Sequence, residues 1–83
     1  MEEKEIGEVI DYFSRVGVIA IKLSSALKIG DTIHIKGHTT DITQEVESMQ
    51  INNKPVKGAK KGDDIGIKVN DRARKNDKVF LVE

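Results

Sequence analysis

The sequence contains no cysteine, only one proline and only three aromatic residues among its 83 residues. Without cysteine the chain has neither a disulfide nor a thiolate for metal binding or nucleophilic catalysis, which is typical of proteins in a reducing compartment. No apolar run approaches the roughly 18 residues that a membrane-spanning helix needs. We therefore expect a soluble, cytoplasmic protein with no membrane partner, stabilised by hydrophobic packing alone.

Several catalytic and cofactor motifs are also missing. No Gly-x-x-x-x-Gly-Lys-Ser/Thr phosphate loop occurs, and the glycine-containing segment 58–62 is followed by Asp63, which repels phosphate, so GTP binding is excluded. No serine has a Gly-x-Ser-x-Gly setting, and His34 and His38 would lie about 13 Å apart along a strand. We therefore expect no enzymatic activity, no metal and no cofactor.

The length of the chain suits one domain, and we treat residues 1–83 as a single unit. The formal net charge is zero, but residues 1–50 carry 5 basic and 9 acidic side chains while residues 51–83 carry 9 basic and 5 acidic ones. A basic half can attract phosphate groups, although exposed lysines also protect the edges of β-sheets. The division of charge leaves both interpretations open, a phosphate-binding surface or an ordinary solvated one.

One eight-residue motif occurs three times, beginning at Lys28, Lys60 and Arg74. Each copy reads basic residue, any residue, Gly or Asn, Asp, any residue, aliphatic residue, any residue, aliphatic residue. Gly and Asn adopt positive φ at low cost, Asp caps a turn through its side chain, and alternating aliphatic residues fit a half-buried strand. Each copy therefore predicts a tight corner that starts a strand.

Alternation of apolar and polar residues predicts six strands and no helix, and these strands span 6–13, 16–23, 32–36, 39–51, 65–69 and 78–82. The residues expected to point inward are Ile19, Ile21, Ile33, Ile35, Ile65 and Ile67. In the strand at 39–51 the apolar residues change parity between Val46 and Met49, which requires a bulge or a sharp bend near Glu47-Ser48. The pattern predicts an all-β fold, a small closed six-stranded antiparallel β-barrel.

The strand at 16–23 has apolar residues on both of its faces. If Ile19 and Ile21 point inward, then Val16, Val18 and Ala20 lie on the outer face. A contiguous exposed apolar area commonly marks an interface. These three residues therefore either meet another chain or are covered by a segment of this one, such as the loop at 24–30 or the N-terminal segment.

Four segments resemble the second, β-barrel domain of elongation factor Tu-type translational GTPases. They are Ile6-Gly7-Glu8-Val9, Asp11-Tyr12-Phe13 with Gly17 four residues on, Leu27-Lys28-Ile29-Gly30-Asp31, and Ala59-Lys60-Lys61-Gly62-Asp63-Asp64-Ile65-Gly66. The resemblance covers nearly the whole chain and implies a translation-protein type barrel. A similar barrel is appended, as a non-catalytic module, to collagenase-like peptidases and to RNA-modifying relatives.

The resemblance also implies a function. In Tu-type factors this domain helps to hold the aminoacylated end of tRNA, and alignment of the corners puts Gln50, Asn52, Asn53 and Gly58 at those positions without the charges or ring that the family uses there. What remains is a non-enzymatic, elongation factor-like module that contacts ribosomal or transfer RNA, or a translation-related protein, through a basic surface. The candidate RNA contacts are Lys54, Lys57, Lys60, Lys61, Arg72, Arg74 and Lys75.

The alternative is a protein-interaction module. It would dock onto an enzyme or a translation factor through the outer apolar face formed by Val16, Val18 and Ala20.

Overall fold

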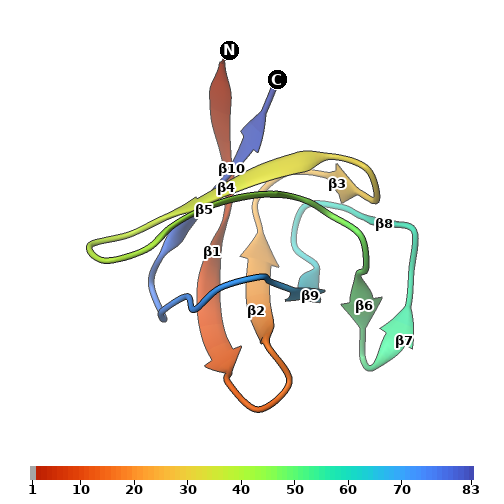
Figure 1. Ribbon diagram of the computed structural model, residues 1–83. Coiled ribbons are helices and arrows are strands. Elements are labelled where there is room, and N and C mark those ends of the chain that lie inside the picture. Colours follow the sequence, from red (N-terminus) through yellow and green to blue (C-terminus); the bar gives the residue numbers. More distant parts are fainter. Residues whose placement is uncertain (1) are drawn as a thin grey trace.

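The computed structural model describes residues 2–83, which form ten β-strands and no helix (Figure 1). The strands are β1 Glu3–Phe13, β2 Val18–Leu23, β3 Leu27–Lys28, β4 Thr32–Lys36, β5 Asp41–Glu45, β6 Gln50–Ile51, β7 Lys54–Pro55, β8 Gly58–Ala59, β9 Asp64–Lys68 and β10 Lys78–Val82. Since the described part of the chain contains no helix, it also contains none that is long and apolar enough to cross a membrane. The all-β class predicted from the sequence is confirmed.

The prediction of a closed six-stranded barrel is wrong. Eight strands form one antiparallel sheet in the order β5-β4-β10-β1-β2-β9-β6-β7, with β5 and β7 at its two edges, and β3 pairs with β8 in a separate two-stranded ribbon. The reason lies in segment 39–51, which we expected to be one strand. It is broken into β5 at one edge of the sheet and β6 near the other, so residues 46–49 join the two ends of the sheet without a ladder between them.

The break itself falls where the change of parity predicted it. Val46 turns away from the line of β5 into one of the corners, because its N–H donates to the carbonyl of Asp31 and its carbonyl accepts from the N–H of Gly30. Val46 and Met49 are both buried although they lie on opposite parities. Residues 46–49 are therefore not a regular β-strand, and this allows both side chains to lie in the core.

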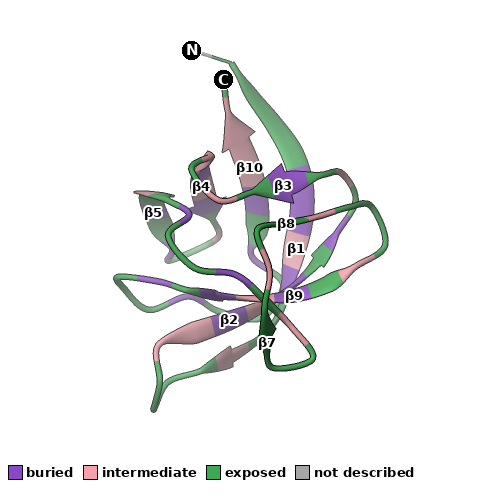
Figure 2. Ribbon diagram, turned by 90° about the vertical axis from the view of Figure 1, so that its right-hand side faces the viewer, coloured by how far each residue is buried: buried purple, intermediate pink, exposed green. Residues whose placement is uncertain are grey.

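The core consists of aliphatic side chains that point inward from the curled sheet, and Figure 2 shows the buried residues concentrated in the strands, with most loop residues exposed. The six isoleucines predicted to point inward are all at most 2% exposed. In the connection after β2, Leu27 is buried and belongs to the core, whereas Ala26 is exposed. Pro55 lies in the edge strand β7 opposite Gln50, a place where its missing N–H costs no ladder bond.

The three copies of the repeated motif form three equivalent corners, as predicted. Gly30, Gly62 and Asn76 have φ values of 95°, 92° and 77°, in the region that favours glycine and asparagine. In each corner an aspartate side chain accepts a hydrogen bond from the backbone N–H three residues earlier, at 2.8–3.0 Å; the pairs are Lys28 and Asp31, Lys60 and Asp63, and Arg74 and Asp77. These aspartates therefore serve the fold.

Candidate functional site

The most distinctive surface lies at the far end of the β1–β2 hairpin. Phe13 and Val16 are 49% and 62% exposed, and Val18 and Ala20 on the outer face of β2 are half-buried. Because Phe13 pairs in register with Val18, the aromatic ring extends the predicted row of Val16, Val18 and Ala20 across both strands. We call Phe13, Val16, Val18 and Ala20 the apolar strip.

Phe13 is the member of the apolar strip that sequence reasoning missed. The signal that could have found it is the hairpin register, which needs the position of the turn. We expected a strand from residue 16, whereas Val16 and Gly17 lie in a turn whose N–H groups both donate to the carbonyl of Phe13. The turn leaves the side chain of Val16 at the tip of the hairpin and the ring of Phe13 beside β2.

A hollow of about 510 Å³ adjoins the apolar strip, between β2 and the β6–β7 hairpin. Its floor includes Gly66 of β9, which has no side chain to fill the space, and β6 touches β9 in register only at Gln50 opposite Gly66. Gln50, Asn52 and Asn53 line the hollow with carboxamides, and Asp64 is the single charged residue in its lining. The hollow thus combines an apolar floor with hydrogen-bonding groups on its wall.

Two asparagines form the tip of the β6–β7 hairpin. Asn52 and Asn53 have φ values of 53° and 65°, which is the geometry of a tight two-residue hairpin turn and one that asparagine tolerates.

The covering of the outer face of β2 that we considered, by the loop at 24–30 or by the N-terminal segment, does not occur among the described residues, because the strip and hollow remain accessible.

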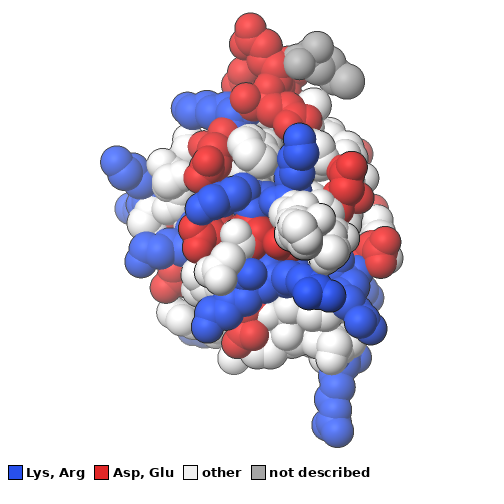
Figure 3. All heavy atoms as spheres, turned by 90° about the vertical axis from the view of Figure 1, so that its left-hand side faces the viewer, with Lys and Arg blue, Asp and Glu red and all other residues white. Residues whose placement is uncertain are grey.

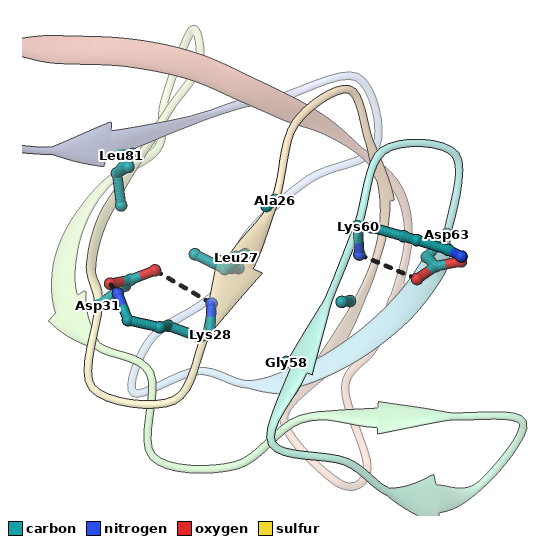
Figure 4. Close-up of a pocket in the computed structure, with 9 residues that line it drawn as sticks. Ala26, Leu27, Lys28, Asp31, Gly58, Lys60, Asp63 and Leu81 are labelled. Carbon is teal, nitrogen blue, oxygen red and sulfur yellow. Dashed lines mark hydrogen bonds and ion pairs between the residues drawn. The ribbon is translucent and has the colours of Figure 1, made fainter.

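The seven cations proposed to contact RNA are all exposed, but several of them lie in different places. Lys60 borders a hollow beside β3 and β8 that also contains Lys28, Asp31 and Asp63 (Figure 4). Lys61 borders another hollow with Glu5 and Glu8.

Arg72 and Arg74 border a third hollow, together with Asp41 and Asp71. Lys54 lies in β7, Lys57 in the loop before β8, and Lys75 in the third corner. Wherever these cations line a hollow, carboxylates line it too, and Figure 3 shows basic and acidic side chains interspersed on one face of the molecule. The structure therefore does not bring the candidate cations together into one basic hollow.

The two histidines differ in their surroundings. His38 is exposed in the β4–β5 turn, whereas the side chain of His34 is only 14% exposed and contacts Glu3 and Asp41. Residues 2–83 contain no group of His, Cys, Asp or Glu side chains arranged to hold a metal ion. Both ring nitrogens of His34 are occupied by carboxylates, so this imidazole has no free nitrogen to act as a general base.

Comparison with known proteins gives close sequence relatives, although no family model matches the chain. The chain is 49% identical over 80 residues to a Methanocaldococcus jannaschii protein named as an uncharacterized protease, which covers 95% of this chain and 20% of that protein. It is 42% identical over 77 residues to a collagenase of Porphyromonas gingivalis, which covers 90% of this chain and 21% of that protein. The chain therefore spans about a fifth of the length of the curated relatives it matches.

Solved structures share the fold. The C-terminal domain of a Geobacillus thermoleovorans protein assigned to the U32 peptidases superposes with a TM-score of 0.89 and 16% sequence identity, over 96% of this chain and 93% of that one. The selenomethionine form of the same domain gives a TM-score of 0.86 over 92% of this chain and 96% of that one. Since those crystal chains contain little beyond the shared fold, a domain of this shape can fold without the rest of its protein.

These relatives overturn the main functional prediction. The matched proteins are named as proteases and collagenases, so an elongation factor-like translation module that contacts RNA is wrong, and the resemblance to the second domain of Tu-type factors is not supported. The corner motifs that carried the resemblance specify turns, and turns define a fold without defining an activity. Over nearly its whole length, the chain is similar to the C-terminal domain of U32 peptidase and collagenase-like proteins.

Proposed function

We propose that this domain is a non-catalytic docking module that binds the peptidase-like part of proteins of the kind it resembles. The observation that carries the proposal is the apolar strip, in which Phe13 and Val16 are 49% and 62% exposed beside the hollow. Small soluble domains seldom leave neighbouring large apolar side chains exposed without an interaction partner.

The relatives supply the reason for this choice of partner. About four fifths of each curated relative lies outside the matched segment, so the equivalent domain shares a chain with a much larger body. Contacts between domains of one chain need little area, because the linker keeps the two surfaces at a high effective concentration. A strip of four side chains with one hollow is of the right scale for such a contact.

The hollow indicates the chemistry of the partner surface. An apolar side chain of the partner would enter over Val18 and Ala20, where Gly66 leaves room. The carboxamides of Gln50, Asn52 and Asn53 can bond to backbone groups beside it, and Asp64 can pair with a lysine or arginine. We therefore expect a partner segment that presents an apolar side chain next to a cation.

The side chains present support a non-catalytic role. Ser14, Ser24 and Ser48 are exposed turn and loop residues, and the chain has no cysteine. A serine nucleophile needs an adjacent base, and His34 is engaged on both nitrogens. The proteolytic chemistry implied by the names of the relatives would then belong to the part of those proteins outside the match.

The test is a binding measurement with the M. jannaschii relative. The part of that protein outside the matched segment is titrated with this chain by isothermal calorimetry, and Val18→Lys, which places a charge in the centre of the apolar strip, should weaken binding at least tenfold. Thr43→Lys is the control, because it also places a lysine on a strand, but Thr43 lies exposed on the edge strand β5, away from β2 and the hollow.

Thermal unfolding of both variants checks that the fold is intact. The proposal fails if the wild-type chain does not bind, or if the two variants weaken binding equally. Asp64→Asn adds a second criterion, since loss of a charge pair should reduce the salt dependence of binding.

A further inference from the structure

His34 lies between two carboxylates that come from distant parts of the chain. Its Nδ1 is 2.8 Å from Oε2 of Glu3 on β1, and its Nε2 is 2.5 Å from Oδ1 of Asp41 on β5. The imidazole is 14% exposed, while the side chains of Glu3 and Asp41 are 38% and 78% exposed. Strand β10 lies between β1 and β4, so the carboxylate of Glu3 reaches across an entire strand to meet the ring.

The hydrogen-bonding chemistry fixes the charge of the ring in this arrangement. An ionised carboxylate only accepts hydrogen bonds, and a neutral imidazole donates from one nitrogen only. Both contacts of His34 can be hydrogen bonds only if both ring nitrogens carry protons. The arrangement seen here therefore requires the imidazolium form, with a carboxylate at each end.

The surrounding charges favour the same form. Glu3 and Glu5 on β1 and Asp41 and Glu45 on β5 share the outer face of the sheet with His34, as the pairing registers show. The cations on this face are Lys36 of β4 and Lys78 of β10, and Lys78 is paired with Glu8 at 2.6 Å. Phe80 of β10, the strand between β1 and β4, is the adjoining aromatic residue, with its ring centroid 6.5 Å from that of His34.

The balance of these interactions raises the pKa of His34. The hydrogen bond that the ring donates to Asp41 is the largest cause, the one that it donates to Glu3 is the second, and partial burial of the ring opposes both. The ring is therefore charged at pH values at which an isolated histidine has begun to lose its proton.

The first residues of β1 depend on this contact more than the rest of the strand does. Residues 3–5 pair only with β10, because pairing of β1 with β2 begins at Gly7. In Figure 1 the start of β1 and the end of β10 project together from the body of the domain. Within residues 2–83, the side-chain hydrogen bond that ties this segment to a strand other than β10 is the one that His34 donates to Glu3.

We infer that His34 acts as a proton-operated clamp, which holds the start of β1 to the β4–β5 hairpin when the ring is doubly protonated and releases it when the ring becomes neutral. Loss of one proton leaves one nitrogen with a lone pair that faces a carboxylate, and that contact becomes repulsive. The inference does not depend on the apolar strip or on the proposed docking function.

Nuclear magnetic resonance of the full chain tests the clamp in two measurements. The first is a pH titration of the ring carbon and nitrogen signals of His34, in the His38→Gln background so that only one imidazole titrates. The midpoint should lie above the ordinary value of 6.5, and both Asp41→Asn and Glu3→Gln should lower it. A wild-type midpoint at or below 6.5, or one that neither substitution moves, overturns the inference.

The second measurement is amide hydrogen exchange of residues 3–5 and 80–82, expressed as protection factors so that the intrinsic pH dependence is removed. Protection should be greatest below pH 6.5 and should fall by roughly two- to thirtyfold as the ring deprotonates, the range expected for two exposed ion pairs. His34→Gln should give the lower protection at every pH, whereas His38→Gln should behave like the wild type. Protection that stays constant while His34 titrates would show that the ring is charged but clamps nothing.

Discussion

The open gap of the sheet is bridged by one side chain, and its removal gives a quantitative test of the fold. Gln44 on the edge strand β5 donates from Nε2 to the carbonyl of Lys68 at 2.9 Å, and its Oε1 accepts from the N–H of Asn70 at 2.9 Å. The carboxamide thus connects the edge strand β5 to the end of β9, a strand with which β5 does not pair. We predict that Gln44→Ala destabilises the domain by removing both of these hydrogen bonds between β5 and residues 68–70.

The magnitude follows from the two bonds and their exposure. A typical intramolecular hydrogen bond contributes about 0.5–1.5 kcal/mol net. Lys68 and Asn70 are exposed, so water can replace the lost partners and no buried group is left unsatisfied. We therefore expect the free energy of unfolding to fall by about 1–2 kcal/mol, which corresponds to a decrease in Tm of about 4–15 °C for a domain of this size.

The assay is chemical denaturation followed by circular dichroism, together with the exchange rate of the Asn70 amide. Glu45→Ala is the matched control, because it also shortens a long side chain to alanine on β5 and Glu45 is exposed. Gln44→Glu separates the two bonds, since a carboxylate still accepts from Asn70 but repels the carbonyl of Lys68, and acid should partly restore stability by returning a donor.

The reasoning is refuted if Gln44→Ala is no more destabilising than Glu45→Ala. It is also refuted if the Asn70 amide exchanges at the same rate in the variant as in the wild type. Either result would mean that residues 68–70 are held beside β5 by packing alone.

The other predictions concern the corners and the pH dependence of stability. Gly30→Val should lower the free energy of unfolding by about 1–3 kcal/mol, because φ is 95° at this position. Gly58→Ala is the control and should leave it unchanged, because the added Cβ would meet its nearest atoms at an ordinary 3.5 Å. Denaturation midpoints of the two variants are compared. Gly37→Ala should lower the free energy of unfolding by about 1–3 kcal/mol, because the new Cβ would lie 1.9 Å from Oδ1 of the buried Asp77. The Asp77 carboxylate would have to move and would lose the hydrogen bond that it accepts from the Arg74 N–H. Loss of hydrogen-exchange protection at the Arg74 amide would identify this cause. Since the pKa of His34 is raised in the folded state, its contribution to stability is complete below about pH 6.5 and is lost as the pH rises through the folded-state value; Tm measured between pH 5.5 and 8.5 should fall more in the wild type than in His34→Gln.

Local chemistry made the corners and the core predictable. Each corner is complete within four residues, because the aspartate bonds to the N–H three residues earlier and the positive φ falls on the Gly or Asn between them. The inward isoleucines follow from the period of two, since a strand that is buried on one face must alternate. These features needed no knowledge of which strands are neighbours.

The position at which the long strand is interrupted was also predictable from the sequence, but the consequence of the interruption for the sheet was not. The change of parity between Val46 and Met49 indicated a break, and the break occurs there. That it sends β5 and β6 towards opposite ends of the sheet depends on the partners that each half finds, which are β4 for one and β7 and β9 for the other. Partner choice is a property of the whole sheet, so the closed barrel was a reasonable prediction and a wrong one.

The sites depend on contacts between residues far apart in the chain, and only the tertiary structure decided these. Gln44 meets residues 24 and 26 positions away, and His34 meets Glu3 from 31 positions away across an intervening strand. Phe13 joined the apolar strip only once the register of the β1–β2 hairpin was known. The same topology separates the cations of residues 51–83. They are close together in the sequence, but the fold places Lys60, Lys61 and the pair Arg72 and Arg74 beside three different hollows.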